Sequence, residues 1–224
     1  MTSLLEISEK AGVEKFIYTS STAVMGHHVH NMDENRACRP NNLYGATKSA
    51  SEVYVLGFNQ YSGETGTFGN EVSMKRNIIR PGYTFSNPLF KDGSSQSDRR
   101  FREITDSVVK NHAIQLIKND GTQFLSGSQI AQVYMALLES DLNEEIFLAL
   151  GCEYTTWERI ARIALEEYPD SKSEIELYDK GWSSEGMLFN VNKIKQVFGL
   201  EFGGEDEIRK HVKWNLEQSV LEMK

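Results

Sequence analysis

The sequence predicts an α/β fold built on a parallel sheet, because short apolar runs alternate with longer segments of helical periodicity. Residues 16–21, 72–79 and 145–150 form three such runs, and helical patterns lie between them as crossover connections. With 224 residues, of which 39% are hydrophobic, the chain can bury a sizeable core. We therefore expect one domain, or one domain with a small additional lobe.

Each predicted helix has a start signal or an apolar stripe. Ser3 can cap a first helix that Gly12 ends, and Ser128 can cap another whose apolar side chains recur at helical spacing. The segment from Thr155 to Glu158 has the spacing of a capping box. The remaining elements in chain order are a polar loop at 27–42, helices at 43–61, 100–110, 192–199 and 208–220, and a strand at 174–178.

Composition argues against several classes of protein. The 24 basic and 32 acidic residues give a net charge of −8, which disfavours nucleic acid as the main partner. Cys38 and Cys152 provide neither a disulfide framework nor zinc spacing, so a reducing, cytoplasmic location is expected. No apolar run reaches the ~18 residues of a membrane helix, and the N-terminus lacks the apolar core of a signal peptide.

Tyr44 and Lys48 stand four residues apart on a predicted helix, so their side chains share one face. A free phenol has a pKa near ~10 and is a poor base, but a neighbouring cation favours its ionised form. A Thr19-Ser20-Ser21 run ends the preceding strand and can supply a hydroxyl to the same site. This combination suits proton transfer to or from a hydroxyl or carbonyl oxygen. An ordinary amphipathic helix would explain the Tyr/Lys spacing equally well.

The wider context distinguishes these interpretations. Three segments resemble, in order and spacing, the extended short-chain dehydrogenase/reductase family, whose NAD-dependent epimerases and dehydratases work largely on sugars and nucleotide sugars. They are Lys15-Phe16-Ile17-Tyr18-Thr19-Ser20-Ser21-Thr22-Ala23-Val24-Met25-Gly26, Tyr44-Gly45-Ala46-Thr47-Lys48, and Ile79-Arg80-Pro81-Gly82. The resemblance implies a partial Rossmann-like sheet in residues 1–86, to which strand 145–150 returns. It also implies a smaller, mainly substrate-binding lobe in residues 87–224.

The resemblance also assigns roles to individual residues. Tyr44 would be the catalytic acid/base, Lys48 would favour its ionised form and hold the nicotinamide ribose of NAD or NADP, and Ser21 would orient the reacting oxygen. Ser21 fits the family position better than Ser20 or Thr19. Pro81 and Gly82 would lie against the nicotinamide, although a Pro-Gly pair also ends strands without any function. Thr22 and Tyr83 would contact a sugar-like substrate, and Tyr83 replaces a common asparagine.

One part of the family pattern has no counterpart in this sequence. The family opens with a strand, a Gly-x-x-Gly-x-x-Gly turn and a helix that holds the cofactor pyrophosphate. The segment from Gly63 to Gly69 matches the letters, but it follows a helix and precedes a strand, so we interpret it as a loop. We therefore expect this chain to be the C-terminal portion of an enzyme of the family, with only part of the binding site for NAD or NADP. The alternative is a non-catalytic remnant that acts as a binding or interaction protein or is an inactive gene product.

Other polar groups have simpler explanations. His27, His28 and His30 lack the spacing of a metal site, so we expect no metal and a solvated loop. Arg99, Arg100 and Arg102 could bind a diphosphate but are more typical of a charged helix face. Two positions depart from the family: Met25 replaces a tyrosine, and Ser128-Gln129 replaces a Val-Asp-Asp motif that supplies a charge.

Self-association is also expected, because in the family the helix before the serine strand and the Tyr/Lys helix pair across a two-fold axis. In this sequence the second helix carries more apolar side chains than one face against a sheet needs, which is typical of an interface. These side chains are Val53, Val55, Leu56, Phe58 and Tyr61, and Val55→Glu is expected to split a homodimer without unfolding it.

Overall fold

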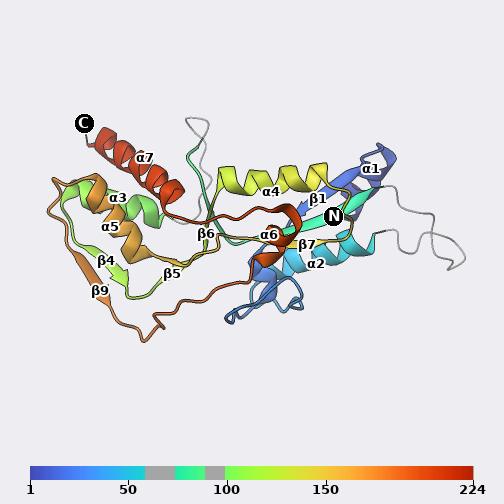
Figure 1. Ribbon diagram of the computed structural model, residues 1–224, viewed down its shortest axis with the longest axis horizontal. Helices are drawn as coiled ribbons and strands as arrows, with labels where there is room; N and C mark the ends of the chain where they lie inside the picture. Colours follow the sequence, from blue (N-terminus) through green and yellow to red (C-terminus); the bar gives the residue numbers. More distant parts are fainter. Residues whose placement is uncertain (59–73, 89–98, 224) are drawn as a thin grey trace, which may run out of the picture. The chain divides into compact units, whose positions relative to one another are not determined.

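The computed structural model describes residues 1–58, 74–88 and 99–223, and its ribbon is drawn in Figure 1. By internal packing the chain divides into two compact units, which are described separately. The first unit comprises Met1–Gly82, Gln129–Ala149 and Phe189–Glu201, and the second comprises Tyr83–Ser128, Leu150–Leu188 and Phe202–Lys224.

The first unit is built on a parallel sheet with the strand order β1-β2-β7. Strand β1 spans Lys15–Thr19, β2 spans Lys75–Pro81 and β7 spans Ile146–Ala149. The register pairs Thr19 with Ile79 and Pro81 with Ala149, so the carboxyl ends of all three strands meet at one edge. The predicted α/β class and the three predicted strands are confirmed.

Helices cover both faces of this sheet (Figure 1). Helix α1 (Thr2–Lys10) and helix α2 (Leu43–Gly57) pack on the face that Phe16 and Tyr18 present. Helix α4 (Gly127–Glu139) lies on the opposite face, where Lys15 and Thr19 point, as the two-residue period of a strand requires. A short helix, α6 (Asn192–Phe198), packs beside β7.

The second unit is organised around three helices and an aromatic core. Helices α3 (Arg100–Lys110), α5 (Trp157–Glu167) and α7 (Asp206–Glu222) pack against one another. Phe101, Phe124 and Trp157 lie at their centre with ring centroids 5.0 to 5.7 Å apart. The short strands pair as β3 (Tyr83–Phe85) with β6 (Phe124–Ser126), β4 (Ile114–Ile117) with β9 (Ile175–Tyr178), and β5 (Gly121–Thr122) with β8 (Thr155–Thr156).

Several local expectations differ from the structure. Helices α4 and α6 belong to the first unit rather than to the second part of the chain, because the stripe of α4 that includes Val133 and Leu137 is buried there. Ser3 lies inside α1, which has no side-chain cap. The cap of α5 is Thr156, one residue later than the predicted capping box, and it accepts a hydrogen bond from the Arg159 backbone. The segment 63–69 lies outside the described residues.

Candidate active site

The carboxyl ends of the three parallel strands bring two predicted site segments to one edge of the sheet. The Ser20 N–H donates to the Ile79 carbonyl at 2.7 Å, and the Gly82 N–H donates to the Ala149 carbonyl at 3.1 Å. Ser20-Ser21 and Pro81-Gly82 therefore lie on neighbouring strand ends. In open α/β sheets, ligands bind at this edge.

Ser21 begins a single 3-10 turn, η1 (Thr22–Met25), and caps it. Its Oγ accepts a hydrogen bond from the Ala23 N–H at 3.2 Å, an arrangement that orients the side chain and leaves its own proton available for donation. Thr22, the predicted substrate contact, is only 8% exposed, and Met25 is fully buried. Met25 therefore fills the core of the turn.

Helix α2 begins directly against this turn. The Asn42 side chain caps the helix by accepting a hydrogen bond from the Gly45 N–H at 2.7 Å. A Cβ atom on Gly45 would lie 2.4 Å from the Ala23 carbonyl oxygen, so only glycine permits this close approach. The first turn of α2 is thereby held on the turn that carries Ser21. Tyr44, which precedes Gly45, keeps 56% of its surface exposed.

Lys48 turns back from α2 toward the end of β1. Its Nζ donates to the Thr19 carbonyl at 2.9 Å and lies 5.3 Å from the ring centroid of Tyr18 and 5.8 Å from that of Tyr44. The ammonium is thus within cation–π distance of two aromatic rings, one of which carries the predicted acid/base hydroxyl. The structure places the elements that carry Ser21, Tyr44 and Lys48 next to one another.

A buried ion pair beneath this site was not predicted. Both Nε and Nη2 of Arg80 donate to the Glu52 carboxylate, at 2.9 and 2.7 Å, and each side chain is only 3% exposed. Such a bidentate pair is geometrically specific, and it locks α2 to β2 immediately before Pro81. In the sequence, this ion pair is indicated only by Arg80, which directly follows two isoleucines, and by Glu52, one helical turn after Lys48.

The loop at 27–42 is tied to the same ion pair. Arg80 Nη1 also donates to the Glu34 carbonyl at 3.2 Å, and the Cys38 thiol lies 3.4 Å from both Arg80 Nη2 and a Glu52 oxygen. Burial raises the pKa of the Cys38 thiol, so this cysteine is a neutral packing group. The side chain of Glu34 accepts from the Leu148 N–H at 2.8 Å, which fixes the loop to β7.

The histidines of this loop do not converge. His28 Nε2 lies 3.3 Å from the Thr22 carbonyl, and its ring packs edge-on against Phe189. Within the described ranges, no group of three His, Cys, Asp or Glu side chains is placed to hold a metal ion. No helix in the described part of the chain is both long enough and apolar enough to cross a membrane.

The remaining predicted contacts lie in the second unit. The Tyr83 ring packs edge-on against Phe124 at 4.9 Å and Trp157 at 5.7 Å, and so contributes to the aromatic core. Arg100 pairs with Asp120 at 3.1 Å and lies over Trp157. Arg102 pairs with Asp106 and Glu222. These pairs fit the charged helix face better than a diphosphate site.

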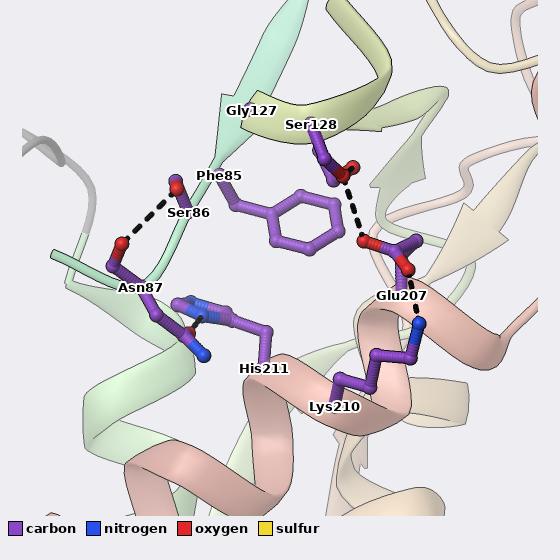
Figure 2. A pocket seen from close by; sticks show the side chains of 9 residues that line it. Phe85, Ser86, Asn87, Gly127, Ser128, Glu207, Lys210 and His211 are labelled. Atoms are coloured by element: carbon purple, nitrogen blue, oxygen red, sulfur yellow. Dashed lines mark hydrogen bonds and ion pairs between the residues drawn. The ribbon is translucent and has the colours of Figure 1, made fainter. Parts of the chain in front are cut away.

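A hollow of about 180 Å³ lies in the second unit, beside the first turn of α4. Figure 2 shows side chains that line it. The sequence predicts that a charge is missing here, because Ser128 replaces an aspartate. In the folded chain a carboxylate from another helix lies at this position, because Glu207 of α7 accepts a hydrogen bond from Ser128 Oγ at 3.0 Å. Hydrogen bonds from Lys210 and then Ser128 lower the pKa of Glu207, so the carboxylate stays ionised.

Comparison with known proteins agrees with this architecture. Residues 1–147 match the model of the NAD dependent epimerase/dehydratase family. A curated relative, a 3 beta-hydroxysteroid dehydrogenase/Delta 5-->4-isomerase of Mycobacterium tuberculosis, is 31% identical over 118 residues. That match covers 51% of this chain and spans only 27% of the relative.

Solved structures share the fold at low sequence identity. A UDP-N-acetylglucosamine 4-epimerase from Methanobrevibacter ruminantium matches 99% of this chain and 67% of its own, with a TM-score of 0.73 and 15% identity. A UDP-glucuronic acid 4-epimerase from Bacillus cereus, solved with NAD, matches 100% and 67% respectively, with a TM-score of 0.73 and 14% identity.

Proposed function

The chain belongs to the NAD-dependent epimerase/dehydratase family, and we propose that it carries the proton-transfer centre of an NAD(P)-dependent epimerase, dehydratase or reductase acting on a sugar or nucleotide sugar. The approach of Gly45 to the Ala23 carbonyl carries this proposal, because it seats the Tyr44/Lys48 helix on the Ser21 turn. The substrate class rests on the solved epimerases of the same fold, two of which were determined with UDP-N-acetylmuramic acid and with UDP-glucose.

In the proposed reaction the side chains of this chain position an oxygen and exchange its proton. Tyr44 Oη takes the proton from a substrate hydroxyl as it is oxidised and returns it on reduction. Ser21 Oγ, held by the Ala23 N–H, donates to the same oxygen. The Lys48 ammonium stabilises negative charge on the phenol oxygen. NAD(P), when bound, would carry the hydride.

The residues of this chain fit one end of that cofactor. In this proposal Lys48, whose Nζ lies at the end of β1, and Tyr44 beside it would hold the nicotinamide ribose, and Pro81-Gly82 would pass against the nicotinamide ring. For the pyrophosphate, no strand in the described ranges leads through a Gly-x-x-Gly-x-x-Gly turn into a helix N-terminus. We therefore expect the 224-residue chain alone to bind NAD(H) weakly or not at all.

Titration calorimetry tests this expectation directly. Heat that saturates with a micromolar dissociation constant for NAD(H) would show that the chain holds the pyrophosphate by another route. Weak binding by a well-folded chain would agree with the proposal. The alternative, a non-catalytic remnant, predicts the same weak binding.

Substitution of Tyr44, the proposed acid/base, distinguishes an enzyme from a non-catalytic remnant. In a version of the protein that turns over, Tyr44→Phe should lower kcat by about 10²–10⁴-fold, the usual worth of general acid/base catalysis, and leave cofactor affinity nearly unchanged. Tyr178→Phe is the matched control, because Tyr178 is on β9 of the second unit and 49% exposed. A Tyr44→Phe variant with normal kcat would reduce Tyr44 to an ordinary helix residue.

The proposed active form is a homodimer. Apolar side chains remain exposed on α1 and α2 of the first unit, among them Leu4, Ile7 and Val53 at 53%, 64% and 68%. Exposed apolar side chains on two neighbouring helices are typical of an interface.

A further inference from the structure

Thr19 is the last residue of β1, and both polar groups of the peptide that joins it to Ser20 form hydrogen bonds. The Ser20 N–H of the peptide donates inward to the Ile79 carbonyl at 2.7 Å, so the Thr19 carbonyl points outward from the sheet. That carbonyl accepts the hydrogen bond from Lys48 Nζ at 2.9 Å. The direction of one carbonyl group thus fixes where the ammonium sits.

The side chain of Thr19 is held by a different element. Its Oγ1 forms a hydrogen bond of 2.5 Å with the hydroxyl of Tyr134, which projects from α4 on the face of the sheet opposite to α2. Tyr134 is half-buried, and its neighbour on the helix, Val133, is completely buried. The tyrosine therefore presents a polar group at the end of an otherwise apolar packing surface.

A second bond ties the other end of β1 to the same helix. Lys15 Nζ donates to the Leu138 carbonyl, one helical turn beyond Tyr134. Helix α4 consequently runs antiparallel to β1, and a hydrogen bond joins the helix to each end of the strand. The Thr19 contact is the one that reaches the candidate site.

From these contacts we infer that Tyr134 is a positioning residue of the site: it holds Thr19 so that the Thr19 carbonyl keeps the Lys48 ammonium beside Tyr44. The chain of contacts runs from the Tyr134 hydroxyl to Thr19 Oγ1, and from the Thr19 carbonyl to Lys48 Nζ. Tyr134 itself touches neither Tyr44 nor a reacting atom in this role. The catalytic meaning of the inference rests on the proposed function, but the arrangement of Lys48 can be measured without it.

The first measurement uses NMR on the chain labelled with ¹³C and ¹⁵N at lysine. The Cε and Nζ resonances of Lys48 are assigned by their loss in Lys48→Arg. Tyr134→Phe and Thr19→Val should each shift them, and the double variant should shift them no further, because both changes break the same link. Tyr178→Phe, on β9 of the second unit and exposed, should leave them in place.

The second measurement uses turnover. In a version that is active with NAD(P), Tyr134→Phe should lower kcat by about 2- to 10-fold, the range of a single hydrogen bond, with KM nearly unchanged. If no version turns over, the proposed function fails while the NMR result still decides the role of Tyr134. Thr19→Val keeps the side-chain shape and replaces Tyr134→Phe if the latter does not fold.

Two outcomes would overturn the inference. One is a folded Tyr134→Phe chain whose Lys48 resonances match those of the unmodified protein. The other is additive shifts from Tyr134→Phe and Thr19→Val, which would mean that the two hydroxyls act on Lys48 independently.

Discussion

Ser128 and Glu207 are 79 positions apart in the sequence, yet the Ser128 hydroxyl donates to the Glu207 carboxylate at 3.0 Å. Ser128 Oγ in turn lies 2.8 Å from Ser126 Oγ. Lys210 Nζ donates to the other Glu207 oxygen at 2.6 Å, and Figure 2 shows Ser128 and Lys210 on either side of the Glu207 carboxylate. A carboxylate from α7 thus lies at the N-terminal turn of α4, where the helix dipole favours a negative charge. The negative charge that the local sequence lacks is supplied by a distant helix.

This arrangement predicts that restoring the usual acidic residue harms the fold. Ser128→Asp would place two carboxylates in contact, and it should lower the free energy of unfolding by about 1–2 kcal/mol, because a charged hydrogen bond is lost and repulsion is added. Adding Glu207→Gln should recover most of the loss, since an amide can donate to the new aspartate. Urea denaturation of the four proteins in this cycle measures the coupling. Purely additive effects would contradict the proposed contact.

A second prediction concerns the two glycines of α2. Gly45→Ala should cost about 1–3 kcal/mol, as overpacking does, because the new Cβ meets the Ala23 carbonyl oxygen at 2.4 Å. Gly57→Ala is the matched control, because nothing lies within 4 Å of its Cβ position. That change should leave the protein as stable or up to about 1 kcal/mol more stable. Similar destabilisation by both changes would mean that Gly45 does not set the contact between α2 and the Ser21 turn.

The buried histidine of the second unit predicts a loss of stability in acid. His211 is 4% exposed, and burial lowers its pKa to about 4 from 6.5. Asn215 Nδ2 lies 3.1 Å from His211 Nε2 and Asn87 Oδ1 lies 2.6 Å from Nδ1, so the neutral ring accepts at Nε2 and donates at Nδ1. A proton on Nε2 would face the amide donor. The folded protein therefore resists protonation of this ring.

The sign of the effect follows from linkage. The unfolded chain binds the His211 proton near pH 6.5 and the folded protein only near pH 4, so stability is full above pH 6.5 and falls as the pH drops toward 4. A difference of this size corresponds to about 3 kcal/mol.

Urea denaturation at pH 7 and pH 4.5 checks this prediction. His211→Gln should lose about 2–3 kcal/mol less than the unmodified protein between these two pH values. His112→Gln is the control, since His112 is exposed at the end of α3. Equal losses in all three proteins would contradict the assignment.

The sequence predicted what local patterns determine. Strand β1, the Tyr44/Lys48 face of α2 and the Pro81-Gly82 strand end could be identified because each is signalled within a few consecutive residues. The Arg80–Glu52 pair and the Thr19–Tyr134 bond join residues 28 and 115 positions apart. Such partners are selected by the order of the strands and the faces that the helices cover, and no local pattern encodes that choice.

The burial of side chains on α2 also could not be predicted from the local sequence. Val53 and Val55 differ by two positions and looked equivalent as apolar interface candidates, yet Val53 is 68% exposed and Val55 is completely buried. Val55 packs with Leu5 and Ile78 in the core of the first unit, and Phe58 belongs to the same cluster. The expected use of Val55→Glu as a dimer-splitting change is therefore wrong, because a buried glutamate without a partner would unfold the unit. Tyr61 lies outside the described residues.

Self-association remains a prediction, and Val53 gives the correct test of it. Sedimentation at tens of micromolar should show a dimer, because Val53 and Tyr54 on α2, with Leu4 and Ile7 on α1, are each more than half exposed. Val53→Glu should yield a folded monomer, since a charge at an exposed position costs the isolated unit little but is desolvated in an interface. Met135→Glu is the control: Met135 is 54% exposed on α4, on the other face of the sheet, so this variant should stay dimeric. An unmodified chain that sediments as a monomer would contradict the prediction. A dimer that Met135→Glu splits and Val53→Glu does not would move the interface to α4.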